Sequence, residues 1–156
     1  MDVCTPLKIR CYLEPSIFRI EVFFQLENPA NADVIQQSIT ITHDLARFYP
    51  SLSSEELAVD VASGILAARV LPYINGNVHV MSNPCYSFHT QKIVEAGRRY
   101  HAIFRRLDPN SDPSRVIMKV PATWEGLQAC RILKAEGIKT LGTTVFSMEQ
   151  CILAGE

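Results

Sequence analysis

Hydrophobic and polar positions repeat with two different periods along the chain. Apolar side chains recur three or four positions apart, the spacing of a buried helix face, in residues 28–49, 53–72, 87–107 and 123–137. Short apolar runs bounded by turn residues predict strands at residues 78–82, 116–120 and 138–146. Strands that alternate with helices in this way indicate βαβ units and a parallel sheet. We therefore expect an α/β protein.

Capping signals support these boundaries. Ser53, followed three residues later by Glu56, is a capping-box pattern, and Asn28–Pro29 is a cap followed by a first-turn proline. Further N-caps are expected at Ser87, Thr123 and Ser147. Gly137 is a typical helix stop. Residues 17–24 alternate in polarity and are expected to form one strand.

The helix patterns also predict which side chains are buried. The helix within 28–49 should bury Val34, Ile35, Ile39, Ile41, Leu45, Phe48 and Tyr49. The helix that follows Thr123 should bury Leu127, Cys130, Ile132 and Leu133. The helix within 87–107 carries arginines that we interpret as a solvated face: Arg98, Arg99, Arg105 and Arg106.

One lysine lies inside the apolar strand that begins at Val116. None of its neighbours (Val116, Ile117, Met118, Val120 and Pro121) can neutralise or hydrate an ammonium group. Desolvation disfavours the charged form of Lys119, and a neutral amine is the species that attacks a ketone to form a Schiff base. The alternative is a lysine whose stem is buried while its ammonium reaches solvent.

Three consecutive motifs resemble the transaldolase family. The run K-V-P-A-T-W-E-G-L-Q-A-C, Lys119–Cys130, resembles the family's Schiff-base strand and the start of the next helix. Val78–Thr90 resembles the strand before it, and Gly137–Gln150 the strand after it. The resemblance covers about residues 53–156, and the first fifty residues match poorly, with Met1–Thr5 only a faint echo of the family's first strand.

The resemblance implies part of a TIM (β/α)8-type barrel. We expect one domain over residues 1–156, with a divergent segment at 1–27 and four or five βα units of parallel sheet in 28–156. A complete barrel of this kind needs about 250 residues, so this length cannot close eight strands. Because side chains alternate along a strand, Ile117, Lys119 and Pro121 share one face, which the resemblance places inside the barrel.

The neighbouring strands would present their own residues to the same interior. By the same alternation, His79, Met81 and Asn83 line up on one strand. Leu141, Thr143 and Val145 line up on the other.

The resemblance also implies a reaction. Lys119 would form an imine with a phosphosugar ketose, and the chain would pass a dihydroxyacetone unit to an aldose acceptor. Thr143 would support the chemistry and Asn83 would bind substrate, while the protonated imine acts as the electron sink, so that no cofactor and no metal are required. Three positions depart from the family pattern: Met81 replaces a glutamate, Asn83 an aspartate and Leu141 an asparagine.

Two other readings are open. The chain is either a non-catalytic barrel fragment that acts as a structural or interaction module, or an incomplete copy of a longer enzyme with little activity. The family's phosphate-binding serine and arginine belong to strands beyond Glu156. The open edges of a partial parallel sheet would favour a homo-oligomer.

Composition narrows the classes of partner. The net charge is −1 with no basic stripe, and no run approaches the roughly 18 apolar residues of a membrane span, so we expect neither nucleic acid nor membrane as a partner. Five cysteines without metal-ligand spacing suggest free thiols in the cytoplasm, with Cys130 and Cys151 as inert core thiols. No metal site is expected around His43, His89 or His101. Trp124 is expected to pack, and Glu125 to complement the helix dipole.

Overall fold

The computed structural model describes residues 16–17, 19–110 and 112–155. Its strands are short: β1 Ser16–Ile17, β2 Val78–Met81, β3 Val116–Pro121 and β4 Thr140–Thr143. Its α-helices are α1 Arg19–Glu27, α2 Ala32–Leu45, α3 Ser54–Val70, α4 Thr90–Leu107, α5 Trp124–Ala135 and α6 Met148–Gly155. Strands and helices therefore alternate from β2 onward, as the sequence predicts.

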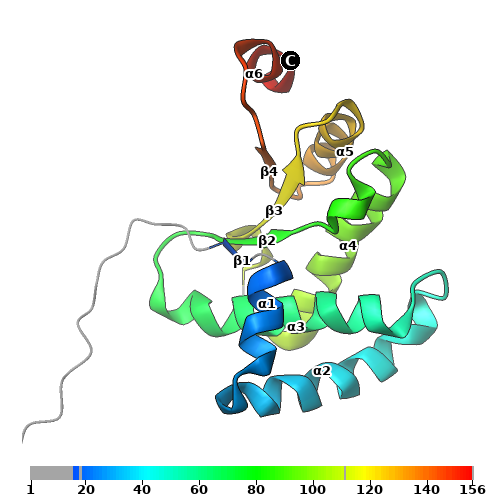
Figure 1. Ribbon diagram of the computed structural model, residues 1–156, viewed down its shortest axis with the longest axis vertical. Helices are drawn as coiled ribbons and strands as arrows, with labels where there is room; N and C mark the ends of the chain where they lie inside the picture. Colours follow the sequence, from blue (N-terminus) through cyan, green and yellow to red (C-terminus); the bar gives the residue numbers. More distant parts are fainter. Residues whose placement is uncertain (1–15, 18, 111, 156) are drawn as a thin grey trace, which may run out of the picture.

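All strand pairs are parallel, and the order across the sheet is β1-β2-β3-β4. Helices α4 and α5 lie on one side of β2, β3 and β4, and no helix of the described residues covers the other side (Figure 1). Consecutive parallel strands with helices on one face are the repeating unit of a β/α barrel. The expected parallel α/β arrangement is confirmed, with four βα units in the described part of the chain.

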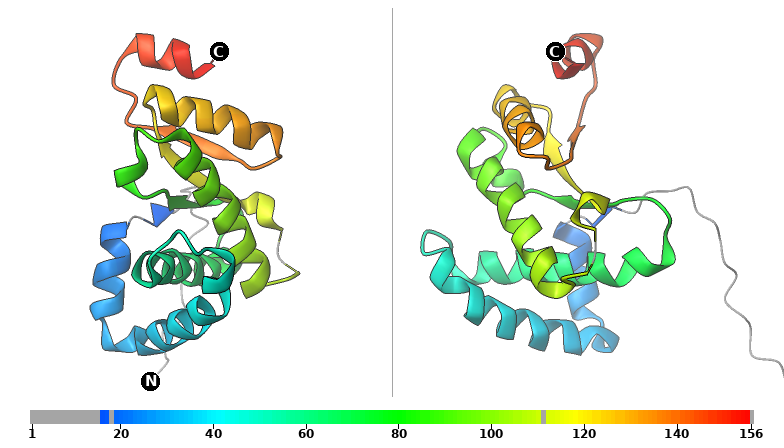
Figure 2. Two further views of the ribbon diagram at one scale, coloured as in Figure 1. Left: turned by 90° about the vertical axis from the view of Figure 1, so that its right-hand side faces the viewer. Right: turned by 180° about the vertical axis from the view of Figure 1, so that it is seen from behind.

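The core is divided into two adjoining clusters. One lies between the sheet and the helices α4 and α5, and its largest members include Tyr100, Phe104 and Leu133. The other joins α1, α2 and α3 to the C-terminal half of α4 through Val22, Leu57 and Ile103. Helix α6 contributes no buried residue to either cluster, and Figure 2 shows it beyond α5 at the C-terminal end of the described residues.

The expected strand at residues 17–24 is wrong, because only Ser16–Ile17 pairs with the sheet and α1 begins at Arg19. Val22 is fully buried against the helical cluster, and Leu26 packs beside it one turn later. An apolar pair four residues apart is the spacing of a helix face, and this tertiary contact overrides the short alternation in the sequence.

The helix expected within residues 28–49 is present as α2, but its buried face differs from the prediction. Val34 is buried, whereas Ile35, Ile39 and Phe48 are 41%, 55% and 62% exposed. The buried stripe continues instead through small polar side chains, Ser38 and Thr42, which allow α2 to approach α3 closely. Ser38 satisfies its hydroxyl by donating to the carbonyl of Val34 at 2.7 Å.

Helix α4 begins at Thr90, so Ser87 is not its N-cap; the Ser87 hydroxyl donates to the carbonyl of Pro84 at 2.6 Å. The interpretation of four solvated arginines is also wrong at one position. Arg98, Arg105 and Arg106 are exposed, but Arg99 is only 3% exposed and pairs with Asp60 of α3. A charged partner on another helix lies outside any local sequence pattern.

Helix α5 begins as expected, because Thr123 accepts a hydrogen bond from the backbone N–H of Gly126 at 3.0 Å. Its buried face is narrower than predicted, since Ile132 is 41% exposed and Trp124, expected to pack, is 59% exposed. The core-thiol prediction fails for Cys151, which is exposed; Cys130 is half-buried, and burial raises the pKa of its thiol.

Several expectations concern the ends of the described residues. Cys4, Cys11 and the segment Met1–Thr5 lie outside them. The strand expected at 138–146 is present but shorter, at Thr140–Thr143.

Among the described residues, no helix is both long and apolar enough to cross a membrane.

Candidate active site

The carboxyl ends of β2, β3 and β4 meet at one edge of the sheet. Lys119 of β3 is in register with Met81 of β2 and with Leu141 of β4. The carbonyl of Lys119 accepts a hydrogen bond from the backbone N–H of Ser82 at 3.1 Å, which continues the ladder past the end of β2. Lys119 is therefore held at the edge where β/α barrels carry their catalytic groups.

The two faces of β3 differ in environment. Val116, Met118 and Val120 are buried in the cluster beneath α4 and α5. Lys119 and Ile117, on the alternate positions, are only partly buried. Alternation thus directs Lys119 to the sheet face that no described helix covers, the face that would line a barrel interior.

Thr143 lies one step further along the same edge. Its register partner is Pro121, so Thr143 is a diagonal neighbour of Lys119 rather than its direct partner. The Thr143 carbonyl accepts a hydrogen bond from the backbone N–H of Ala122 at 2.8 Å, which fixes β4 against the end of β3. The next residue, Thr144, has a φ of 62°, a strained conformation for a β-branched residue.

The motif after Lys119 joins the loops that follow β2 and β3. The Thr123 hydroxyl donates to the carbonyl of Ser87, and the Thr90 hydroxyl donates to the carbonyl of Glu125 at 3.0 Å. Gly126 lies against the end of β3, where a Cβ would stand 2.0 Å from the carbonyl oxygen of Pro121. The turn after Lys119 therefore packs too tightly to accept a side chain at position 126.

Asn83 begins the short 3-10 helix Pro84–Tyr86, and its side chain turns toward α3. Its Oδ1 accepts a hydrogen bond from the backbone N–H of Cys85 at 3.1 Å, and its Nδ2 donates to Glu56 Oε1 at 2.8 Å. The expected line of His79, Met81 and Asn83 is interrupted there, because the strand ends at Met81.

Sequence reasoning treated Glu56 as part of a capping box and missed its position at this edge. Glu56 accepts hydrogen bonds from the Tyr86 hydroxyl and from Asn83. Burial raises the pKa of Glu56, but these hydrogen bonds and the charges of Arg19 and Arg99 outweigh it and leave the pKa below its usual value. Burial and the bond to Glu56 raise the pKa of Tyr86 to about 12, so the hydroxyl remains a donor at neutral pH.

A buried network of charged side chains lies next to Glu56, and no local sequence pattern predicts it. Asp60, only 1% exposed, pairs with Arg99 at 2.7 Å and with Arg19. The Tyr100 hydroxyl lies 3.2 Å from Asp60 Oδ1 and 3.2 Å from the carbonyl oxygen of Met81. Because Met81 is the register partner of Lys119, this network ties the helical layer to the strand beside the lysine.

Among the described residues, no three His, Cys, Asp or Glu side chains come together in a metal-binding arrangement. His43 is in α2 and His89 precedes α4, while His101, in α4, is half-buried. Burial and the charge of Arg105 lower the pKa of His101. Glu125 lies in the first turn of α5, the position where a carboxylate complements the helix dipole.

The parallel strands with helices on one face are the repeating unit of a β/α barrel, and Lys119 lies toward their carboxyl ends, where such barrels carry their functional groups. Comparison with known proteins specifies the family. The model of the family "Transaldolase/Fructose-6-phosphate aldolase" matches residues 15–156. The chain belongs to this family, and its sheet is part of a TIM (β/α)8-type barrel.

Individual relatives are similar but longer. A transaldolase of Prochlorococcus marinus (strain MIT 9301) is 28% identical over 127 residues, covering 81% of this chain and 38% of the relative. A transaldolase of Buchnera aphidicola is 32% identical over 101 residues, covering 65% and 31%. One of Chlamydia muridarum is 31% identical over 91 residues, covering 58% and 27%. The chain thus spans less than two fifths of the length of these relatives.

Proposed function

We propose that this chain forms a Schiff base between Lys119 and the ketone of a phosphosugar ketose and transfers a dihydroxyacetone unit to an aldose phosphate. The observation that carries the proposal is the place of Lys119 at the carboxyl edge of β3, on the sheet face that no described helix covers. Membership of a family described as transaldolase and fructose-6-phosphate aldolase supports the substrate class. The proposal includes a cytoplasmic, pentose-phosphate role, in keeping with that class.

In the proposed reaction the Lys119 amine adds to the ketone carbon, and loss of water gives the protonated imine. The hydroxyl on the β carbon then loses its proton to water, and the bond between the α and β carbons breaks. Its electron pair moves into the imine to give an enamine, and the aldose leaves with its new aldehyde group. The three-carbon enamine that remains on Lys119 attacks the acceptor aldehyde. Water finally releases the ketose product and restores the amine. Thr143, the diagonal neighbour of Lys119, is proposed to orient a substrate oxygen or a water through its hydroxyl.

The residue beside Lys119 limits the rate that this chain can reach. Met81, its register partner on β2, carries no ionisable group and cannot move a proton during imine formation or bond cleavage. Loss of a positioned general acid–base group typically reduces a rate by about 100-fold or more. We therefore expect imine formation to be easier to detect than complete group transfer.

Borohydride trapping tests the proposal directly. Incubation with fructose 6-phosphate and borohydride is expected to add one reduced ketose to the intact mass, because the reductant converts the imine to a stable amine. Lys119→Arg should abolish the adduct, since a guanidinium does not form the imine. The matched control is Lys139→Arg, an exposed lysine before β4, which should retain it. An adduct that persists in Lys119→Arg, or none in the unaltered chain at high ketose concentration, would refute the proposal.

A second candidate function is a structural module that pairs with a second copy of itself. The observation that favours it is the apolar surface beyond β4, an edge strand of the sheet that the described residues form. Its exposed side chains, all at least 37% exposed, are Leu141, Val145, Phe146, Met148, Ile152 and Leu153. A cavity of about 350 Å³ between α5 and α6 leaves the last helix loosely packed. Two such edges side by side would extend the sheet and cover these side chains.

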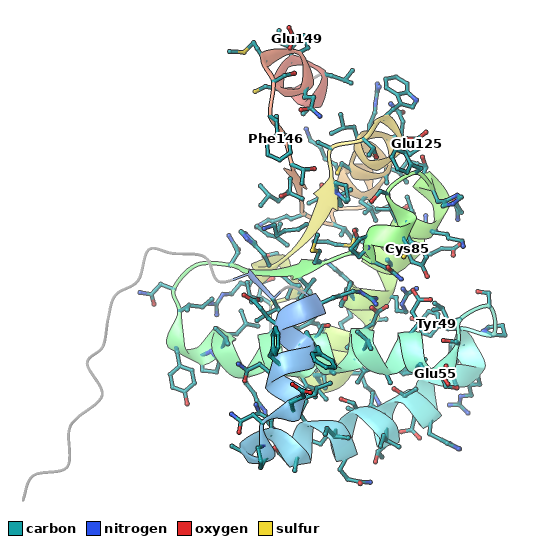
Figure 3. All side chains as sticks on the ribbon, viewed as in Figure 1. Tyr49, Glu55, Cys85, Glu125, Phe146 and Glu149 are labelled. Carbon is teal, nitrogen blue, oxygen red and sulfur yellow. The ribbon has the colours of Figure 1, made fainter. Side chains whose placement is uncertain are left out.

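Self-association at micromolar concentration is therefore expected in sedimentation velocity. Phe146→Asp should weaken it, because Phe146 is 89% exposed beside α6 and the change leaves the described core untouched (Figure 3). Phe48→Asp is the control and should have no effect, since Phe48 is 62% exposed just after α2, a helix that lies far from α6 (Figure 1). A monomer at all accessible concentrations, with a sharp cooperative melt, would exclude the module.

A further inference from the structure

Two asparagines in this chain occupy nearly identical local structures but have different partners. Asn28 and Asn83 each precede a proline, begin a 3-10 helix and accept a hydrogen bond from the backbone N–H two residues later, at 3.0 and 3.1 Å. An aspartate satisfies this turn as well as an asparagine does. The local backbone therefore does not explain why position 83 carries an amide.

The difference lies on α3. Asn83 Nδ2 donates to Glu56 Oε1 at 2.8 Å, and the same oxygen accepts the Tyr86 hydroxyl. Glu56 is anionic at neutral pH, because those two donors and the charges of Arg19 and Arg99 stabilise its carboxylate. A carboxylate with these partners requires a donor at position 83, and an amide supplies one where an aspartate cannot.

We propose that Glu56 is a positioning residue that holds the turn after β2 and dictates the amide at position 83. With aspartate at 83, two carboxylates would face each other at hydrogen-bond distance, with no donor between them. The exchange of the family's aspartate for Asn83 is therefore coupled to Glu56.

The coupling has a consequence for the site, which rests on the proposed function. Asn83 follows Met81 by two residues at the carboxyl end of β2, and Glu56 holds its amide on α3, out of line with His79 and Met81. Glu56 and Tyr86 also line a cavity of about 780 Å³ at the same end of α3 and α4. The lining of this cavity carries charges of both signs, from Glu56, Glu95 and Glu125 and from Lys92 and Arg99.

A double-mutant cycle in urea at neutral pH tests the coupling. Asn83→Asp is expected to raise the equilibrium constant of unfolding by about ten-fold or more, because it places like charges together. In the Asn83→Asp background, adding Glu56→Gln should lower the equilibrium constant of unfolding by at least about three-fold, since the glutamine amide now donates to the aspartate. This effect is opposite in sign to the effect of Glu56→Gln in the unaltered chain. In the unaltered background Glu56→Gln should raise the constant, because it removes the charge next to Arg19 and Arg99.

Asn28→Asp should leave unfolding unchanged, because its side chain makes the same turn and is exposed to solvent. Equal effects of Glu56→Gln in both backgrounds would overturn the coupling. If Asn83→Asp does not fold, a folded double variant supports the proposal and an unfolded one overturns it. The cycle needs no activity, so absence of the borohydride adduct in the unaltered chain would refute the proposed function and leave this test decisive.

Discussion

Replacing Asp60 with alanine is expected to lower the free energy of unfolding by about 3–5 kcal/mol, as for other buried ion pairs that lose one partner. Asp60 and Arg99 are 1% and 3% exposed, so Asp60→Ala leaves a guanidinium in the core without its counter-charge. The side chain of Arg19, 20% exposed, loses the same partner but can reach solvent. Urea unfolding followed by circular dichroism measures the change.

Asp33→Ala is the matched control. Asp33 also pairs with an arginine of another element, Arg69, but the two side chains are 52% and 39% exposed. Water solvates both ends of that pair, so its loss should leave the unfolding midpoint nearly unchanged. A similar, small effect of both variants would show that the Asp60 network is hydrated and not a buried charge cluster.

Tyr100 connects Asp60 to the candidate site. Its hydroxyl lies between Asp60 and the carbonyl of Met81, the register partner of Lys119. Loss of Asp60 removes one contact of this hydroxyl and is expected to loosen the end of β2. We therefore expect slower borohydride trapping in Asp60→Ala even under conditions where the protein remains folded.

Local signals in the sequence were sufficient for much of this fold. The caps Ser53 and Thr123 accept the expected backbone hydrogen bonds, from Glu56 and Gly126 respectively. The period of two in β3 correctly separated Lys119 from the buried positions Met118 and Val120. These features depend on residues within one turn or one strand, so a single sequence contains them.

Features that depend on a partner far along the chain were not predictable in the same way. Arg99 is separated from Asp60 by 39 positions, and nothing near Arg99 distinguishes it from its exposed neighbour Arg98. The strand expected at 17–24 failed for the same reason, since α3 and its packing surface decide that Val22 lies on a helix.

The candidate site shows the same division. The alternation of side chains in the sequence predicted which residues share a sheet face with Lys119, but the register of Lys119 with Met81 and Leu141 depends on how the strands pair. The orientation of Asn83 did not, because β2 ends at Met81 and the following turn directs the amide to Glu56 on α3. The roles of Lys119, Thr143 and Asn83 stay predictions for the trapping experiment.

Gly126→Ala is expected to destabilise the protein by about 3 kcal/mol or more, as for severe overpacking. Helix propensity alone predicts the opposite, a gain of about 1 kcal/mol for alanine over glycine within a helix. The added Cβ, however, would lie 2.0 Å from the carbonyl oxygen of Pro121, a backbone atom that cannot rotate away. Either α5 or the end of β3 must move, and Lys119 lies only two residues before Pro121. Borohydride trapping should therefore slow together with the loss of stability.

Gly142→Ala provides the comparison for this effect, because Gly142 lies in β4 of the same sheet edge. A Cβ there would meet only Leu127, at the ordinary contact distance of 3.9 Å, and alanine should be tolerated. Comparing the thermal unfolding temperatures of Gly126→Ala and Gly142→Ala separates the steric clash of the added Cβ from the general effect of replacing a glycine with alanine. A Gly126→Ala protein as stable as the unaltered chain would mean that α5 does not start against Pro121, and that the turn after Lys119 is looser than the geometry described above.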